Sequence, residues 1–392
     1  MCYAIPGKIT DIKDKIVTVD YFGEIKKARN EFYELNPGDY IYAQGGFVIN
    51  KISNEEAEVI LETWREFFFK LKEVDLKLTY DTKTLHQRAN AVRRQNTDNS
   101  CCVHGIVEFS NYCINDCLYC GLRKSNNTCI RYRMDTEEIV ETCENAVNKL
   151  GFKALVLQSG EDFFYDDEKL SKIINRIREK CAVLLVMSIG ERDLKIYQKL
   201  YQYGARGVLL RFETNNHELY KKIRPGHVLE DRINLIKSLR DMGFLIMTGF
   251  LVGLPEQSEA DILSGIDLTG TLGTDMFSFG PFIPHPQTPL AGNPIPDINL
   301  VLDTIARARM RFPASKILAT TALETLDKKN GAQKGLLAGA NSLMINVTPK
   351  KYQSLYELYP DRAGIESDIE EKINLTLELL YSLGRAPADI GI

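Results

Sequence analysis

The sequence predicts an α/β protein in which a small OB-like β-barrel with one helix precedes a (β/α)8 TIM barrel. From residue 103 onward, short apolar runs alternate with amphipathic helical stretches. The first 75 residues instead contain β-branched and aromatic runs separated by Pro-Gly pairs. The length of 392 residues accommodates one barrel of about 250 residues together with an additional module.

The N-terminal module is expected to span residues 1–75. Residues 16–22 and 39–49 have the composition of β-strands. Ser53 begins a Ser-x-x-Glu capping box and opens a strongly helical stretch. Residues 76–102 are polar and are expected to form a connector to the barrel of residues 103–392.

Eight apolar runs in the second module are expected to be the strands of the barrel. They comprise residues 105–109, 154–158, 183–188, 207–211, 244–250, 275–279, 317–321 and 342–347. Their largely apolar character suits parallel strands that are buried on both faces. The helices expected between and after them include residues 136–150, 166–180, 229–242, 297–312, 330–338 and 367–383. In such a barrel, catalytic residues follow the carboxyl ends of the strands.

Composition excludes several classes of function. Forty-nine Lys and Arg residues against 53 Asp and Glu residues give a net charge of −4, which disfavours a nucleic-acid-binding role. No apolar run approaches the roughly 18–20 residues of a membrane helix, and the first residues do not have the layout of a signal peptide. A cytoplasmic protein is therefore expected, and its nine cysteines favour metal or redox chemistry over disulfides.

Cys113, Cys117 and Cys120 form a C-x3-C-x2-C motif directly after the first expected strand of the barrel. Three thiolates in one loop can hold a [4Fe–4S] cluster whose fourth iron stays open to a small molecule. Tyr119 can shield such a cluster from solvent. A zinc site and unrelated buried cysteines are the alternatives, although zinc usually takes four protein ligands.

The triplet and the pattern around it resemble the radical S-adenosylmethionine (SAM) superfamily, and the resemblance covers residues 80–392. It implies one [4Fe–4S] cluster, SAM bound to the open iron, and reductive cleavage of SAM to a 5′-deoxyadenosyl radical. It also implies an external reductant such as ferredoxin or flavodoxin.

The sequence flanking the triplet is similar to HydE, the maturase of [FeFe]-hydrogenase. The matching segments are residues 103–113, 118–123, 157–162, 253–255, 280–290, 319–323 and 352–356. Methylornithine synthase and biotin synthase share parts of this pattern. The HydE resemblance implies a small iron complex carrying CO, cyanide and cysteine as substrate, and other hydrogenase maturases as partners. Some members carry a second cluster on C-terminal cysteines, which the segment after Pro360 lacks.

Polar residues at the ends of two expected strands are candidates for binding SAM. Gln158 and Ser159 end the second strand, beside Gly160, and Ser188 ends the third. Backbone carbonyls near a glycine can hold the SAM ammonium group. An ordinary polar loop is the alternative.

Arg211 and Glu213 close the fourth expected strand, and Arg232 lies near the start of the following helix. A glutamate flanked by two arginines suits an amino-acid-like cofactor, because guanidinium groups bind carboxylates and the glutamate can bind hydroxyl or ammonium groups. The HydE resemblance implies that these positions contact SAM. A structural ion-pair network is the alternative.

Four further residues are candidates for lining the substrate cavity. Thr320 and Thr321 end the seventh expected strand and can donate hydrogen bonds to an anion. Met344 and Tyr352, from the eighth strand and just after it, match cavity positions of the HydE family. Strand propensity for the threonines and a core position for the methionine are the alternatives.

The N-terminal segment from Met1 to Lys8 and residues 38–49 are similar to HypC, a small chaperone of [NiFe]-hydrogenase maturation. The resemblance implies that Cys2, after removal of Met1, is a ligand of an iron carrying CO and cyanide. A terminal cysteine offers both a thiol and an α-amino group. The alternative is an ancestral domain without a current role.

Three functions remain open at this point. The first is a radical SAM maturase, and the second is a carbon-skeleton radical enzyme similar to methylornithine synthase. The third is a non-catalytic scaffold that carries iron. Formation of 5′-deoxyadenosine from SAM separates both enzymes from the scaffold.

Overall fold

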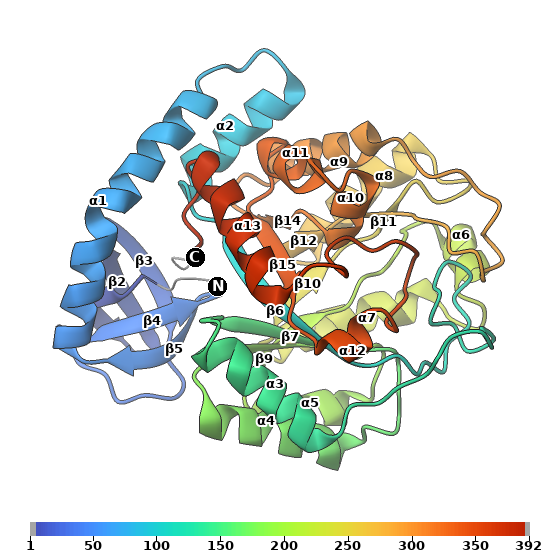
Figure 1. Cartoon of the computed structure of the whole chain (residues 1–392), viewed down its shortest axis with the longest axis horizontal. Helices are drawn as coiled ribbons and strands as arrows, with labels where there is room; N and C mark the ends of the chain where they lie inside the picture. Colours follow the sequence, from blue (N-terminus) through green and yellow to red (C-terminus); the bar gives the residue numbers. More distant parts are fainter. Residues whose placement is uncertain (1–4, 389–392) are drawn as a thin grey trace.

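The computed structural model describes residues 5–388, which form two closed β-barrels (Figure 1). One barrel has five strands in the order β1-β2-β3-β5-β4. The other has eight parallel strands in the order β10-β12-β14-β15-β6-β7-β8-β9. The predicted fold class, a small β-barrel followed by a TIM-like barrel, is confirmed.

The strands of the smaller barrel are short and mostly antiparallel. They are β1 (Gly7–Lys13), β2 (Ile16–Tyr21), β3 (Glu24–Arg29), β4 (Tyr40–Gln44) and β5 (Phe47–Ile52). The prediction located β2, β4 and β5 but missed β1 and β3, and β3 is a mostly charged strand in which only Ala28 is buried. Gly45 and Gly46, with φ of 58° and 79°, form the hairpin turn between β4 and β5, and they lie within the run of residues 39–49 that has strand composition.

Two helices connect the barrels, where the prediction expected one helix and a polar connector. The first helix, α1 (Asn54–Leu78), starts at Ser53, whose side chain accepts a hydrogen bond from the Glu56 N–H. The second, α2 (Leu85–Thr97), occupies most of the expected connector, in which the sequence analysis identified no helix. The reason is tertiary, because the α2 residue Arg93 is fully buried and donates a 2.8 Å hydrogen bond to the buried Asp75 of α1.

Each predicted strand of the larger barrel overlaps a strand of the structure. The barrel strands are β6 (Cys102–Ser110), β7 (Ala154–Ser159), β8 (Leu184–Ser188), β9 (Ala205–Leu209), β10 (Leu245–Thr248), β12 (Met276–Ser278), β14 (Lys316–Leu318) and β15 (Ser342–Asn346). Beyond β10 and β12, the short strands β11 (Leu251–Val252) and β13 (Gly280–Pro281) pair with each other.

Helices surround this barrel and alternate with its strands (Figure 1). They are α3 (Thr136–Asn148), α4 (Asp167–Lys180), α5 (Leu194–Tyr203), α6 (His217–Ile223), α7 (Leu229–Asp241), α8 (Glu259–Thr271), α9 (Ile298–Arg311), α10 (Thr321–Leu326), α11 (Gly331–Leu337), α12 (Lys350–Gln353) and α13 (Ile369–Ser382). Within residues 5–388, none of the helices combines the length and apolar character that a bilayer crossing requires.

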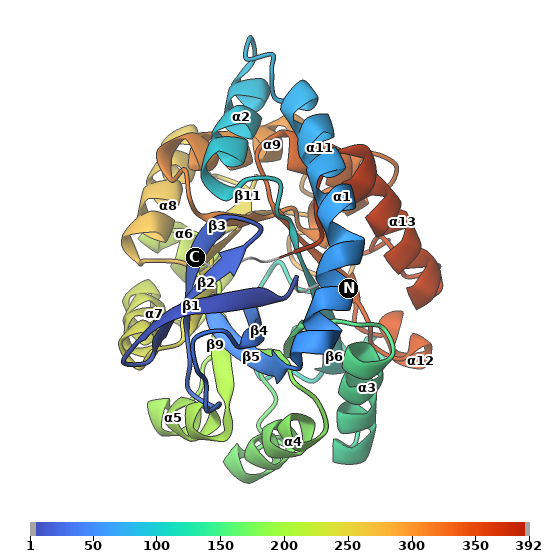
Figure 2. The same cartoon turned by 90° about the vertical axis from the view of Figure 1, so that its left-hand side faces the viewer.

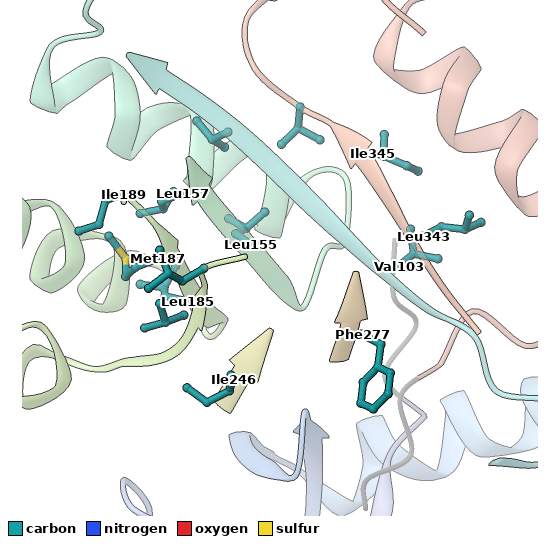
Figure 3. Close-up of a cluster of buried hydrophobic side chains, with 14 of the residues drawn as sticks. Val103, Leu155, Leu157, Leu185, Met187, Ile189, Ile246, Phe277, Leu343 and Ile345 are labelled. Atoms are coloured by element: carbon teal, nitrogen blue, oxygen red, sulfur yellow. The ribbon is translucent and has the colours of Figure 1, made fainter. Parts of the chain in front are cut away.

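The barrel strands are buried on both faces, as their apolar sequences predict. On β7, Leu155 and Leu157 belong to the main core (Figure 3). Val156, between them, belongs to a separate cluster with residues of other barrel strands. This alternation follows from the two-residue period of a β-strand. Burial of each large aliphatic side chain contributes about 1.5–3 kcal/mol, so the barrel is a rigid frame for the loops at its ends.

The smaller barrel lies against the amino ends of the eight parallel strands (Figure 2). Tyr42 and Phe47 pack in one apolar cluster with Leu184 and Leu245, the first residues of β8 and β10. The C-terminal segment returns to the smaller barrel, where Ala386 enters its core. The N-terminal module therefore covers the end of the larger barrel that is opposite to the carboxyl ends of its strands.

Candidate active site

A cavity of about 280 Å³ lies at the carboxyl ends of the barrel strands. Most of the residues singled out from the sequence line this one cavity, although they are spread over more than 230 positions of the chain. They are Cys113, Cys117, Tyr119, Cys120, Gln158, Ser159, Ser188, Arg211, Glu213, Arg232, Thr320, Thr321 and Met344. The barrel brings them together because consecutive strand ends meet at the same rim.

The loop that carries the three cysteines follows β6 and is held in place by hydrogen bonds to neighbouring segments. The Asn111 side chain donates hydrogen bonds of 2.7 Å to the carbonyls of Ile130 and Leu355. The Glu161 N–H, in the loop after β7, donates to Cys113 Sγ at 3.4 Å. A Cβ atom at Gly160 would lie 2.2 Å from the Tyr112 carbonyl oxygen, so glycine is required for this close approach.

The three thiols are in an environment that opposes their ionisation when no metal is bound. Burial raises the pKa of Cys113, raises that of Cys117 to about 11, and raises that of Cys120 further. The positive charge of Arg224 acts in the opposite direction on Cys117. Iron must therefore displace the thiol protons, as metals do at thiolate sites. Within residues 5–388, no three His, Cys, Asp or Glu side chains converge closely enough to surround one metal ion.

Arg211 and Glu213 lie on the wall of the cavity contributed by the segment after β9. An Arg211 guanidinium nitrogen lies 3.2 Å from Glu213 Oε2, an ion pair without hydrogen-bond geometry. Glu213 has a φ of 64°, which is unusual for a non-glycine residue and is characteristic of functional sites. Its buried Oε2 accepts no hydrogen bond from the described residues and is therefore available to a ligand.

Glu191, which the sequence analysis missed, contacts two arginines and a histidine beside this wall. Its Oε1 lies 2.7 Å from Arg232 Nε and 3.5 Å from Arg224 Nη1, and its Oε2 lies 3.4 Å from His227 Nδ1. The His227 side chain is only 23% exposed. Glu191 follows β8 by three residues, so its place beyond a strand end was the available signal.

Glu161 connects the Glu191 loop to the cysteine loop. Its Oε2 accepts hydrogen bonds from Asn115 Nδ2 at 3.0 Å and from the Glu191 N–H at 2.9 Å. Asn115 lies between Cys113 and Cys117, and its Oδ1 contacts His227 Nε2 at 3.0 Å. Burial raises the pKa of Glu161. This network fixes the cysteine loop relative to the Glu191 loop, which contacts Arg232 of α7.

Gln158 and Ser188 occupy neighbouring positions on paired strands. The Ser188 hydroxyl donates to Gln158 Oε1 at 3.3 Å, and the two residues are partners in the β7–β8 register. The Ser159 hydroxyl donates to the Gly160 carbonyl at 2.6 Å. All three polar side chains therefore lie at the rim, between the cysteine loop and the Arg211 wall.

Thr320 and Thr321 line the cavity, but they do not end a strand as predicted. Strand β14 ends at Leu318, and Thr320 caps α10 by accepting a 3.2 Å hydrogen bond from the Leu323 N–H. Thr321 is the first residue of that helix. A Cβ atom at Gly280 would lie 2.8 Å from Arg211 Nη1 and 3.9 Å from Thr320 Oγ1, so both side chains face the same region.

Tyr352 lies away from the cavity, contrary to its predicted position. Its ring stacks on Tyr132 with centroids 4.6 Å apart, and its hydroxyl donates to Glu138 Oε2 at 2.8 Å. Tyr356 and Tyr359, four and seven residues later, are the tyrosines of this segment that line the cavity. Cys2, the predicted iron ligand of the N-terminal module, lies outside the described residues.

Comparisons with known proteins match both modules. Residues 107–269 match the radical SAM superfamily, and residues 1–64 match the HupF/HypC family. The chain is 39% identical over 305 residues to the [FeFe] hydrogenase maturase subunit HydE of Thermotoga maritima, an alignment covering 78% of this chain and 87% of that protein. The chain belongs to the HydE-like radical SAM family. It is an enzyme of this family fused to a HypC-like module.

Other members of the superfamily are also similar to this HydE-like chain. The 3-methylornithine synthase of Methanosarcina barkeri is 30% identical over 309 residues, which cover 78% of this chain and 85% of that protein. The crystal structure of methylornithine synthase (PylB) has a TM-score of 0.70 at 27% identity, covering 82% of this chain and 97% of that chain. A structure of the [FeFe]-hydrogenase maturase HydG, with a TM-score of 0.63 at 18% identity, shows the shared fold.

The family implies a [4Fe–4S] cluster and SAM, and the residues of the cavity fit both groups. Three cysteine thiols lie on one wall, which is the donor set that a cluster with one open iron requires. Buried Glu213 Oε2 and Arg224 Nε have no hydrogen-bond partner among residues 5–388, whereas Arg232 Nε lies 2.7 Å from Glu191 Oε1. A carboxylate and guanidinium groups in this state are suited to the charged and hydroxyl groups of SAM.

Proposed function

We propose that this HydE-like enzyme cleaves SAM reductively and uses the resulting radical on a small iron complex carrying CO, cyanide and cysteine. The product would enter assembly of a hydrogenase active site. The observation that carries the proposal is one cavity with the cysteine triplet on one wall and Arg211, Glu213 and Thr320 on another. When bound, a reduced cluster and SAM together supply a 5′-deoxyadenosyl radical.

The residues of the chain have separate tasks in this proposal. Cys113, Cys117 and Cys120 hold the cluster, and Tyr119 covers it. Gln158, Ser159 and Ser188 are expected to bind the amino-acid portion of SAM at the rim, where they line the same cavity as Cys113. Glu213 and Arg232 are expected to bind its hydroxyl and carboxylate groups, as charge-assisted hydrogen bonds.

The substrate is expected to lie between Arg211, Thr320, Thr321 and Met344. Arg211 and Thr320 face the same region beside Gly280, and together they offer a positive charge and a hydroxyl donor to an anionic ligand. Met344 provides an apolar wall. Charged donors combined with apolar walls hold an anion while excluding water, which protects a radical from side reactions.

The N-terminal module supports a role in hydrogenase maturation over other radical chemistry. It matches the HupF/HypC family over residues 1–64. We propose that Cys2 binds an iron that carries CO and cyanide, and that the module exchanges it with the barrel or with other maturases. Reductants such as ferredoxin or flavodoxin are the expected electron donors.

The proposal is tested by anaerobic iron–sulfur reconstitution of the full chain, followed by SAM and dithionite. We expect 5′-deoxyadenosine from the wild type and none above background from a variant in which all three cysteines are alanine. Addition of a synthetic iron complex with CO, cyanide and cysteine ligands should accelerate its formation and consume the complex. Equal product from wild type and triple variant would refute the radical chemistry.

A second candidate function is the formation of 3-methylornithine. The similarity to two methylornithine synthases in sequence and in fold favours it. The same reconstituted enzyme, supplied with SAM, dithionite and a mixture of amino acids, should then release 3-methylornithine. Detection of that product, with no effect of the iron complex, would replace the maturase proposal.

A further inference from the structure

One buried arginine in the wall of the active-site cavity has no task in the reaction proposed above. Arg224 is 2% exposed, and it lines the cavity together with the three cysteines. It is the residue that directly follows helix α6. A guanidinium is always charged in proteins, and burying a charge is costly unless other groups compensate for it. The position of Arg224 therefore calls for an explanation.

The backbone places Arg224 directly beside the second cysteine of the triplet. The Leu118 N–H donates a 2.9 Å hydrogen bond to the Ile223 carbonyl. Leu118 follows Cys117 in the chain and Ile223 precedes Arg224, so this bond joins the peptide unit after Cys117 to the peptide unit before Arg224. With standard bond lengths, the carbonyl carbon of Cys117 and the backbone nitrogen of Arg224 are at most about 7 Å apart.

The Arg224 guanidinium is held through one of its nitrogens. Nη1 donates hydrogen bonds to the Tyr220 hydroxyl at 3.1 Å and to Glu191 Oε1 at 3.5 Å. Nε is buried and has no hydrogen-bond partner among residues 5–388. Buried donors are nearly always paired in folded proteins, and a redox or catalytic role is one of the recognised reasons for an exception.

The charge of Arg224 acts on the cysteine loop. Burial raises the pKa of Cys117 to about 11, and the largest opposing influence is the positive charge of Arg224, whereas Glu213 acts against it to a smaller extent. Burial alone would lower the pKa of Arg224, but the neighbouring Tyr119 and Cys117 groups act in the opposite direction and raise it. The guanidinium therefore stays positive, at a position where water screens its field only weakly.

We infer that Arg224 is a positioning residue that acts through the cluster: its buried positive charge stabilises the electron that a [4Fe–4S] cluster on Cys117 accepts, and it thereby raises the reduction potential. Net charge and hydrogen bonds around an iron–sulfur cluster set that potential. The electron comes from the external reductant, and Arg224 keeps its proton throughout. The inference rests on the proposed function for the presence of the cluster, but not for the substrate.

Glu191 limits the effect of Arg224 and provides a second way to change the local charge. Its Oε1 lies 3.5 Å from Arg224 Nη1 and 2.7 Å from Arg232 Nε, so one carboxylate lies between two buried guanidinium groups. Two positive charges and one negative charge leave one net positive charge beside the cysteine loop. Removal of Arg224 and removal of the Glu191 charge should therefore shift the reduction potential in opposite directions.

The test measures the reduction potential of the reconstituted full-length enzyme without SAM, in a redox titration followed by electron paramagnetic resonance. At a given potential, Arg224→Gln should have an at least ten-fold lower ratio of reduced to oxidised cluster, which is a shift of about 59 mV for one electron. Glu191→Gln should raise this ratio. Arg224→Lys keeps the charge and should lie between the wild type and Arg224→Gln. Lys222→Gln removes the same charge at a side chain of α6 that is 53% exposed, and should match the wild type within two-fold.

Equal potentials in the wild type and Arg224→Gln would overturn the inference. Shifts of Arg224→Gln and Glu191→Gln in the same direction would also overturn it, because loss of a merely structural contact has no opposite sign. Iron and sulfide content per chain reports cluster assembly, and if Arg224→Gln assembles no cluster, the sign of the Glu191→Gln shift decides. Wild-type enzyme whose potential depends on Arg224 but which forms no 5′-deoxyadenosine would remove the proposed function and leave the role of Arg224 intact.

Discussion

Glu31 of the N-terminal module and Arg206 of the eight-stranded barrel form a buried ion pair. Glu31 Oε2 accepts a hydrogen bond of 2.7 Å from Arg206 Nε, and the two side chains are 9% and 7% exposed. Tyr201 donates a second hydrogen bond to Glu31 at 3.1 Å, and the Arg206 guanidinium packs on the Phe32 ring. Arg206 lies on β9, so this pair attaches the small barrel to the end of the large barrel that faces away from the active site.

Replacing Glu31 by glutamine should destabilise the docked arrangement by about 3 kcal/mol, because it leaves the Arg206 charge buried without its partner. Trp64, the only tryptophan, lies on α1 and reports on the N-terminal module. Its fluorescence in a urea titration should show a lower unfolding midpoint. Glu34→Gln, at an exposed position of the same segment, should change the free energy of unfolding by less than about 0.5 kcal/mol. Equal midpoints for the two variants would contradict this account.

The three cysteines of the triplet should differ from their neighbour Cys129 in iron binding. Cys113→Ala removes a proposed cluster ligand, so iron content and the visible absorbance after reconstitution should fall to background. Cys129 is half-buried and receives a weak hydrogen bond from Asn111 Nδ2 at 3.7 Å. Cys129→Ala should retain the wild-type iron content and spectrum. If the two variants lost iron equally, the assignment of the ligands would be wrong.

Glu213→Gln should weaken SAM binding without changing the cluster. The substitution keeps the size of the side chain and removes the charge of a buried oxygen that accepts no hydrogen bond from the described residues. Loss of a charge-assisted hydrogen bond costs about 1.5–3 kcal/mol, which corresponds to a roughly ten- to hundred-fold higher Kd. Equilibrium dialysis with labelled SAM measures this change. Glu230→Gln, at a side chain that is 56% exposed, is the matched control and should bind SAM normally.

Deprotonation of Glu24 should make the N-terminal module less stable as the pH rises from about 5 to 8. Burial, together with a hydrogen bond that the protonated Glu24 carboxyl donates to Asp98, raises the pKa of Glu24 to about 7, although Lys72 opposes this shift. The folded state therefore holds a proton that the unfolded state has lost above about pH 4.5, and this stabilisation disappears as the pH passes 7. After allowance for partial exposure, the expected loss is about 1 kcal/mol.

The Glu24 prediction is checked by urea unfolding at both pH values with Trp64 fluorescence. The wild type should be more stable at pH 5 than at pH 8. Glu24→Gln has no titrating group at this position, so its free energy of unfolding should vary less over the same interval. A variant that kept the full pH dependence of the wild type would assign the effect to another group.

The barrel could be predicted from the sequence because each of its strands has a recognisable local composition. Runs such as residues 154–157 are buried on both faces and are therefore continuously apolar. Strand β3 and helix α2 were not predicted, because charged and polar residues dominate both. Their stability comes from partners elsewhere in the chain. The Arg93 and Asp75 contact, between two different helices, is one example.

The candidate site was predictable to the extent that its residues follow strand ends. The cysteine triplet, Arg211 and Thr320 were located in this way, and they do line one cavity. Glu191 was missed although it occupies an equivalent position after β8, because its role depends on two arginines and a histidine from other segments. Tyr352 was misplaced because its orientation depends on stacking with Tyr132, which lies 220 positions earlier.

The sequence by itself determined the class of each module, the cysteine spacing and the order of polar residues at the rim. Periodicity and spacing are local properties, so they can be read directly from the amino-acid sequence. Only the tertiary structure decided that the N-terminal module covers the end of the barrel opposite to the cysteines, and that Glu31 of this module pairs with Arg206 of the barrel. Such placements depend on shape and charge matching between surfaces formed by distant segments, which no local pattern encodes.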